Sequence, residues 1–255
     1  MTQQEQFIKN PNLPRGRVTR AIVSGLHNDV LEGLRQLKIT PMVFPVSLAL
    51  PKPVCDHADM LFHHLGDNSL LVAGELPQQT CSDLRSFGTN VLKAKRAMGD
   101  AYPEDSLLNG LRLGRRLFCN RKAIDEAIID ACEKSCVQVI HVNQGYTRCS
   151  SAIVNEHALI TSDNGLARAA ALEGIDVLKI EPGNISLPGY LYGFIGGACG
   201  LVDKNSLAFA GELKTHPEKN RILGFIRNHG VQVLELCKGE LRDIGGILPL
   251  TEEVV

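Results

Sequence analysis

The chain has 255 residues, of which 44% are hydrophobic and 22% charged, and its formal net charge is −1. These values are typical of a globular protein with a substantial core, and they argue against non-specific binding to nucleic acid or anionic membranes. The N-terminus is polar and no apolar run approaches ~18 residues. We therefore expect no signal peptide, no membrane helix, and a cytoplasmic protein whose eight cysteines are reduced.

A short apolar strand that ends in a small or turn-forming residue recurs five times along the chain. The copies begin at Arg20, Ser69, Arg116, Ala158 and Ser206, with spacings of 49, 47, 42 and 48 residues. Two of them, NSLLVAGEL (68–76) and NSLAFAGEL (205–213), agree at seven of nine positions. An internal repeat of this period indicates an array of one supersecondary unit.

Each copy is followed by a segment of helical pattern and then by a second strand. In the first helical segment Val30, Leu31 and Leu34 recur at the spacing of one helix face. The predicted helices span 28–38, 78–88, 122–135, 164–174 and 216–230, and the strands after them span 40–45, 90–94, 137–142, 175–180 and 231–236.

A further strand precedes most copies, joined to them by tight polar turns that are typical of hairpins. These incoming strands are predicted at 59–65, 106–113, 150–154 and 196–202. The first copy has only a polar N-terminal arm before it, residues 1–15, whereas 242–250 is a strand without a unit. We therefore expect the last strand to complete the first unit, so that 16–255 form one domain of five ββαβ units without exposed sheet edges at the closure.

A closed ring of five ββαβ units resembles the pentein, or guanidino-group-modifying enzyme, superfamily, over about residues 16–250. The resemblance implies an α/β fold, a five-fold pseudosymmetric β/α-propeller. The superfamily includes arginine and agmatine deiminases, dimethylarginine hydrolases and amidinotransferases, together with a non-enzymatic ribosome anti-association factor. The chain also resembles a bacterial family of this fold that has no assigned activity.

The pentein enzymes attack the guanidinium carbon with a cysteine, assisted by a histidine and a carboxylate. The resemblance places the cysteine in a motif like GG-x-I-H-C, where this chain has Pro249. It places the histidine in a motif like H-L-K-S, where Thr147 stands. The acid belongs to a motif like E-G-G-D, where Leu108-Asn109-Gly110-Leu111 carries no carboxylate. Guanidine hydrolysis by the usual mechanism is therefore not expected.

Three segments that the repeat does not explain are candidate site loops, because loops on a rigid scaffold commonly carry function. They are 143–151, the glycine-rich 182–197, and the closing 242–246. We expect them to gather near the central axis around a polar pocket, with the paired glycines 196–197 and 245–246 allowing close packing of strands. The candidate ligand-binding residues are Tyr146, Thr147, Arg148, Asp163, Tyr190, Tyr192, Arg242 and Asp243.

Two functional hypotheses stay open. In the first, the chain is a non-catalytic protein that binds a small polar or guanidino-like ligand, or a macromolecular partner. In the second, it is a hydrolase or amidinotransferase acting on a guanidino or amide substrate with Cys149 as a relocated nucleophile, assisted by His63, His64 or His157. Neither needs a cofactor. The segment Cys55-Asp56-His57-Ala58-Asp59 is compatible with metal binding, but a loop leading into a strand explains it equally well, and we predict no metal. The oligomeric state does not follow from the sequence.

Overall fold

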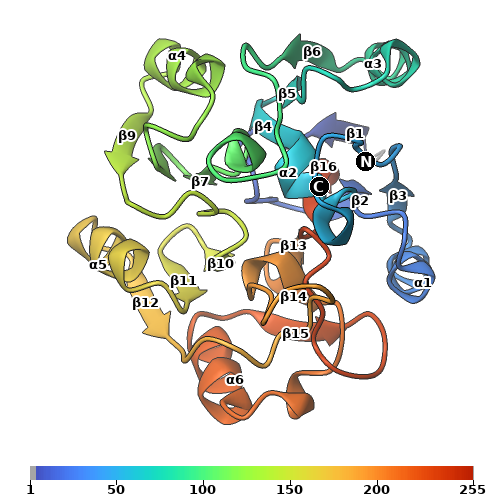
Figure 1. Cartoon of the computed structure of the whole chain (residues 1–255). Coiled ribbons are helices and arrows are strands. Elements are labelled where there is room, and N and C mark those ends of the chain that lie inside the picture. The colour runs from blue at the N-terminus through green and yellow to red at the C-terminus, as the bar shows by residue number, and fades with distance from the viewer. Residues whose placement is uncertain (1–3, 255) are drawn as a thin grey trace.

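The computed structural model describes residues 4–254, which form a mixed α/β fold of five small sheets. Figure 1 shows the sheets following one another around a common centre, with the longer helices toward the outside and the short helix α2 (Ala58–Leu61) near the centre. Residues 1–3 of the predicted arm, and residue 255, lie outside the described residues. Across residues 4–254, every helix is too short or too polar to cross a membrane.

Four sheets share one topology, in which an incoming strand pairs antiparallel with the repeated strand and an outgoing strand pairs parallel with it. They are β4 (Phe62–Gly66), β5 (Ser69–Val72) and β6 (Asn90–Lys93); β7 (Leu111–Leu113), β8 (Arg116–Cys119) and β9 (Gln138–His141); β10 (Ser151–Asn155), β11 (Ala158–Thr161) and β12 (Asp176–Lys179); and β13 (Cys199–Asp203), β14 (Ser206–Phe209) and β15 (Gln232–Glu235). The repeated strands are buried along nearly their whole length, because they lie in the middle of each sheet.

The fifth sheet joins the two ends of the chain. The C-terminal strand β16 (Leu248–Val254) pairs antiparallel with β2 (Arg17–Ile22), which pairs parallel with β3 (Thr40–Met42). The C-terminal strand therefore does complete the first unit, although it spans 248–254 and not the predicted 242–250. The N-terminal arm also contributes, because β1 (Gln4–Phe7) pairs with the outer edge of β16. Its polar sequence gave no strand signal.

One helix crosses between the parallel strands of each unit. These helices are α1 (Asn28–Gln36), α3 (Gln78–Ser86), α4 (Glu126–Lys134), α5 (Asn164–Leu172) and α6 (Lys219–Asn228). Two begin with a side-chain cap, since Asp125 accepts from the N–H of Ala127 and Asp163 from that of Leu166. Several end at a residue with positive φ, such as Gly174 and Gly230, which allows the chain to turn into the outgoing strand.

The incoming segments differ from the prediction at their central ends. Residues predicted as the start of a strand at 59 lie in the short helix α2 (Ala58–Leu61), and 3-10 turns occupy Glu104–Ser106 and Gly196–Ala198. The strands begin only after these turns. Their apolar residues fit either structure, and the crowded centre favours compact turns over extended strands. As a result, several turns rather than strand ends surround the centre of the molecule.

Candidate functional site

The turns that precede the incoming strands bring polar side chains from four of the five units to the centre of the fold. These side chains are His57 and Asp59 from around α2, Asn109 before β7, Cys149 before β10, and Asp243 before β16. The segment before β13 contributes Gly196 and Gly197 instead. All five polar residues are buried.

Cys149, Asp59 and Asn109 form one hydrogen-bonded cluster. The thiol of Cys149 donates to Oδ2 of Asp59 at 2.8 Å, and Nδ2 of Asn109 donates to the sulfur at 2.9 Å. Oδ1 of Asn109 accepts from the backbone N–H groups of Arg148 and Cys149, both at 3.0 Å. Its Nδ2 also lies 3.2 Å from the carbonyl oxygen of Asp59. Asn109 therefore links three of the five units through a single side chain.

The cluster holds Cys149 as a thiol. Burial raises the pKa of Cys149 well above its ordinary value, and the nearby carboxylates of Asp59 and Asp243 raise it further. Burial also raises the pKa of Asp59, to about 6. Near neutral pH the proton therefore resides on the sulfur and is donated to a carboxylate. A cysteine nucleophile needs the opposite condition, a depressed pKa that yields a thiolate.

Asp243 is held on the other side of the centre by backbone donors. Its Oδ2 accepts from the N–H of Phe194 at 2.8 Å and its Oδ1 from that of Gly245 at 3.1 Å. Nδ1 of His57 lies 3.7 Å from Oδ1. A Cβ on Gly197 would come within 1.9 Å of the same oxygen, so only glycine leaves room for this carboxylate.

A pocket of about 320 Å³ opens over this centre. Its lining is largely aromatic and aliphatic, with two carboxylates and no Lys or Arg: Val54, His57, Met60, Asp105, Tyr146, Cys149, Leu187, Tyr190, Leu191, Tyr192, Phe194 and Asp243. The ring of Tyr146 stacks on that of Phe194 with 6.1 Å between centroids, and its hydroxyl donates to Oδ2 of Asp105 at 2.6 Å. Tyr190 and Leu191 are exposed at the rim. A pocket with these walls suits a small ligand that has an apolar body and a positive charge.

Five of the residues predicted from sequence line this pocket, namely Tyr146, Cys149, Tyr190, Tyr192 and Asp243. The other four have structural contacts elsewhere. The hydroxyl of Thr147 donates to backbone carbonyls and accepts from the N–H of Leu111 at 2.9 Å. Asp163 caps α5, and Arg242 forms an ion pair with Asp29.

Arg148 is buried but does not line the pocket. Its guanidinium donates to the carbonyl oxygen of Gly196 at 3.1 Å and to Oδ1 of Asn12 at 3.2 Å. Successive side chains of the turn before β10 point to different sides, so Tyr146 and Cys149 reach the pocket whereas Thr147 and Arg148 do not. The sequence alone does not show which of these four neighbouring side chains face the pocket.

The histidines proposed to assist Cys149, namely His63, His64 and His157, do not line this pocket. His63 and His64 are both buried, although alternation on a strand predicts one inward and one outward, because both faces of β4 are covered. Nδ1 of His63 is 3.0 Å from the carbonyl oxygen of Leu108, and burial lowers its pKa to about 4. The histidine that lines the pocket is His57. The available signal in the sequence is the Asp-His-x-Asp pattern at 56–59, which a loop leading into a strand explains equally well.

Replacing Asp59 with asparagine is expected to change the pH dependence of stability. The folded-state pKa of Asp59, about 6, lies above its ordinary value of 3.8. The group therefore stabilises the fold fully below about pH 4, and this contribution is lost as pH rises through about 6, a change of about 3 kcal/mol. Asp59→Asn keeps an acceptor for the thiol. Because asparagine does not ionise, the variant does not lose this stability as pH rises.

Urea unfolding at a series of pH values checks this expectation. Relative to the parent, Asp59→Asn should gain about 3 kcal/mol between roughly pH 4 and 7. The matched control is Asp130→Asn, an exposed aspartate whose pKa is lowered by Lys95, which should show no gain toward neutral pH. Parallel curves for Asp59→Asn and the parent would contradict a buried, charged Asp59.

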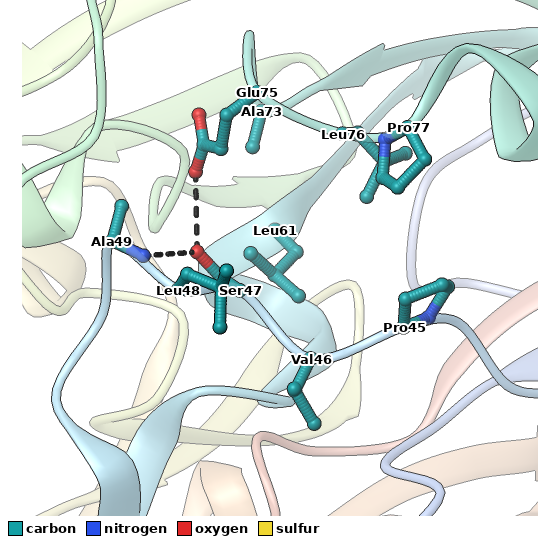
Figure 2. Close-up of a pocket in the computed structure, with 10 residues that line it drawn as sticks. All are labelled: Pro45, Val46, Ser47, Leu48, Ala49, Leu61, Ala73, Glu75, Leu76 and Pro77. Carbon is teal, nitrogen blue, oxygen red and sulfur yellow. Dashed lines mark hydrogen bonds between the residues drawn. The ribbon is translucent and has the colours of Figure 1, made fainter.

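A second pocket, of about 440 Å³, lies beside the loop that follows β3 (Figure 2). Its lining includes the buried residues Leu61, Ala73 and Leu76. The hydroxyl of Ser47 donates to Oε1 of Glu75 at 3.3 Å, as Figure 2 shows. The other lining residues are Pro45, Val46, Leu48, Ala49 and Pro77. Glu75 is the one ionisable group in this lining, so the central pocket is the better candidate site. Among residues 4–254, no group of three or more His, Cys, Asp or Glu is placed to hold a metal.

Comparisons with known proteins agree with this fold. A family model described as a family of unknown function, DUF6873, matches residues 22–248. No curated protein matches the chain. Among solved structures, an amidinotransferase of saxitoxin biosynthesis from Microseira wollei is similar at a TM-score of 0.59 and 9% identity, covering 90% of this chain and 91% of its own.

Two further solved structures are similar over almost their full length. The inosamine-phosphate amidinotransferase of Streptomyces griseus has a TM-score of 0.59 and 11% identity, with 98% of this chain and 97% of that one covered. A DDAH of Pseudomonas aeruginosa in complex with citrulline has a TM-score of 0.55 and 10% identity, with 93% and 100% covered. At such identities the likeness shows the fold alone. The mixed α/β fold that the resemblance to the pentein superfamily implies is thereby confirmed.

Proposed function

Because the chain belongs to the family of unknown function DUF6873, we propose its function from the geometry of its own site. The protein binds a small organic cation in the central pocket and does not use Cys149 as a nucleophile. The observation that supports this most directly is the hydrogen bond from the thiol of Cys149 to the buried carboxylate of Asp59, at 2.8 Å. That bond keeps the sulfur protonated beneath a pocket that is otherwise well formed.

The proposal includes the arrangement of the fold. We infer that residues 16–254 form a single five-bladed β/α-propeller, with 4–15 as an arm that joins the first blade through β1. Support comes from the five sheets of like topology and from the pairing of β16 with β2. In such a ring the turns before the incoming strands meet at the axis, where the central pocket lies.

The composition of the pocket supports a cationic ligand. Asp105 and Asp243 line it without a Lys or Arg to neutralise them, and His57 is the one basic side chain in the lining. Tyrosine and phenylalanine rings can hold a cation over their faces, and the aliphatic residues can bury its apolar part. Structural neighbours include an agmatine deiminase with its substrate bound and the DDAH complex with citrulline.

The positions at which the pentein enzymes carry their catalytic groups support the absence of that chemistry here. Pro249 lies in β16, paired with Ala21, and has no nucleophilic group. The hydroxyl of Thr147 is fully occupied by backbone partners, and Asn109 has an amide in place of a carboxylate. Chemistry by the usual mechanism would need all three groups.

Calorimetry with agmatine, which carries both an ammonium and a guanidinium group, tests the proposal. We expect one molecule to bind per chain. Leu187→Trp fills the pocket and should abolish binding, whereas Leu48→Trp, a control at a fully exposed leucine, should leave it unchanged. Binding that survives Leu187→Trp would place the site elsewhere, and no binding to the parent would count against a cation pocket.

A second candidate function is an enzyme with Cys149 as its nucleophile. It is favoured by one observation, that Cys149 and His57 line the same pocket. It predicts fast, selective alkylation of Cys149. The proposed binding function predicts instead that the exposed Cys136 and the half-buried Cys237 react first and that Cys149 reacts only after unfolding. Mass spectrometry of the labelled peptides separates the two, and selective labelling of Cys149 near neutral pH would favour the enzyme.

Two other expectations stay predictions. The function proposed here needs no cofactor, and the protein is expected in the cytoplasm. Binding of a macromolecular partner also stays open, since the apolar rim residues Tyr190, Leu191 and Tyr192 are exposed around the pocket.

A further inference from the structure

We propose that the central pocket selects an ammonium group over a guanidinium group, and that the carboxylate of Asp105 is the partner of the ammonium. This inference rests on the proposed function, since it specifies the cationic head group that the same pocket accepts. The number of free carboxylate oxygens in the pocket determines which head group it accepts.

Asp105 is a buried carboxylate with one oxygen unpaired. The residue is 5% exposed and lines the pocket from the 3-10 turn at Glu104–Ser106. Its Oδ2 accepts from the hydroxyl of Tyr146 at 2.6 Å, whereas its Oδ1 is buried and has no hydrogen-bond partner in the part of the chain that the structure describes. A buried carboxylate oxygen without a donor is unfavourable, so a donor supplied by a ligand would satisfy it.

Asp243, the other carboxylate in the lining, has no oxygen without a hydrogen-bond partner. Both oxygens of Asp243 already accept from backbone N–H groups, those of Phe194 and Gly245, and the residue is 3% exposed. Asp59 lies beneath Cys149 and does not line this pocket. Asp105 is therefore the carboxylate best placed to pair with a ligand.

The two cationic head groups differ in the number of carboxylate oxygens with which they form hydrogen bonds. A guanidinium is planar and pairs best through two parallel N–H···O bonds, one to each oxygen. With Oδ2 taken by Tyr146, Asp105 can offer only one oxygen. An ammonium is a compact charge that donates well to a single oxygen, and its remaining charge can lie over an aromatic face. Tyr146 and Phe194 supply such faces, stacked 6.1 Å apart beside Asp105.

Calorimetry with three matched probes tests the inference: phenylbutylamine, phenylbutylguanidine and phenylbutanol. They share one apolar body and differ in the head group. We expect the amine to bind at least about 10-fold more tightly than the guanidine. Asp105→Asn should weaken the amine about 10- to 100-fold and leave the alcohol unchanged, which also shows that the variant is folded. Glu104→Gln, at the adjacent half-exposed carboxylate, is the matched control and should change nothing.

The outcomes separate this inference from the function on which it rests. If the guanidine binds as tightly as the amine, or if Asp105→Asn leaves the amine unaffected, the ammonium inference is overturned while cation binding stands. If neither cation binds more tightly than the alcohol, both the inference and the proposed function fail.

Discussion

Gly196→Ala is expected to prevent folding or to leave a protein with little remaining stability. A Cβ at this position would lie 2.3 Å from the carbonyl oxygen of Ser151 and 2.5 Å from those of Arg148 and Cys149. Three backbone atoms cannot all move aside, because the turn that carries them is held by Asn109. The expected cost exceeds about 4 kcal/mol, a large part of the stability of a typical domain.

The control for this prediction is Gly224→Ala in α6. No atom lies within 4 Å of the Cβ that would be added there. Because alanine favours a helix interior over glycine, this variant should be more stable than the parent by about 0.5–1 kcal/mol. Thermal unfolding of both variants measures the contrast. A Gly196→Ala variant that unfolds within a few degrees of the parent would mean that the central turns are not packed as described.

Asn109→Ala is expected to cost about 3–5 kcal/mol. The substitution removes the acceptor of the Cys149 N–H and the stronger of two acceptors of the Arg148 N–H, and it opens a cavity at a fully buried position. It also removes the donor to the sulfur of Cys149. The loss should therefore affect the cooperativity between three units as well as the total stability.

Asn90→Ala, in β6, is the matched control. Asn90 is exposed, and its side chain makes one hydrogen bond to Ser69, so its replacement should cost well under about 1 kcal/mol. Chemical denaturation of both variants, with hydrogen exchange at the turn before β10, gives the comparison. Equal stability of the two variants would show that Asn109 does not link the units.

Much of the fold was predictable because four of the five units bury the repeated strand on both faces. That burial requires a continuous apolar run, and the run is visible five times in the sequence. The turns at the centre were less predictable. Residues 58–61 are apolar enough for a strand, yet they form α2, because the central turns of several units crowd the same space. The pairing of β1 with β16 could not be predicted, because the N-terminal segment that forms β1 is polar and shows no strand pattern.

The candidate site was only partly predictable, for a related reason. Its residues come from different units, and sequence analysis fixes the order of units but not which side chain of each turn faces the axis. The sequence does not distinguish Tyr146 and Cys149, which line the pocket, from Thr147 and Arg148, which do not. At Asn109 the sequence shows only that a carboxylate is absent, whereas in the structure its amide joins the cluster. No sequence motif indicates Asp105 as a site residue, because its unpaired oxygen is apparent only from the structure.

The central claim is that the protein binds a cation without reacting with it. The most direct test is to incubate the protein with a stoichiometric amount of agmatine and to measure the masses of both by mass spectrometry. We expect a one-to-one complex from which agmatine is recovered unchanged, with no added mass on the protein. Release of a hydrolysis or transfer product, or a covalent adduct on Cys149, would contradict it and establish the chain as an enzyme.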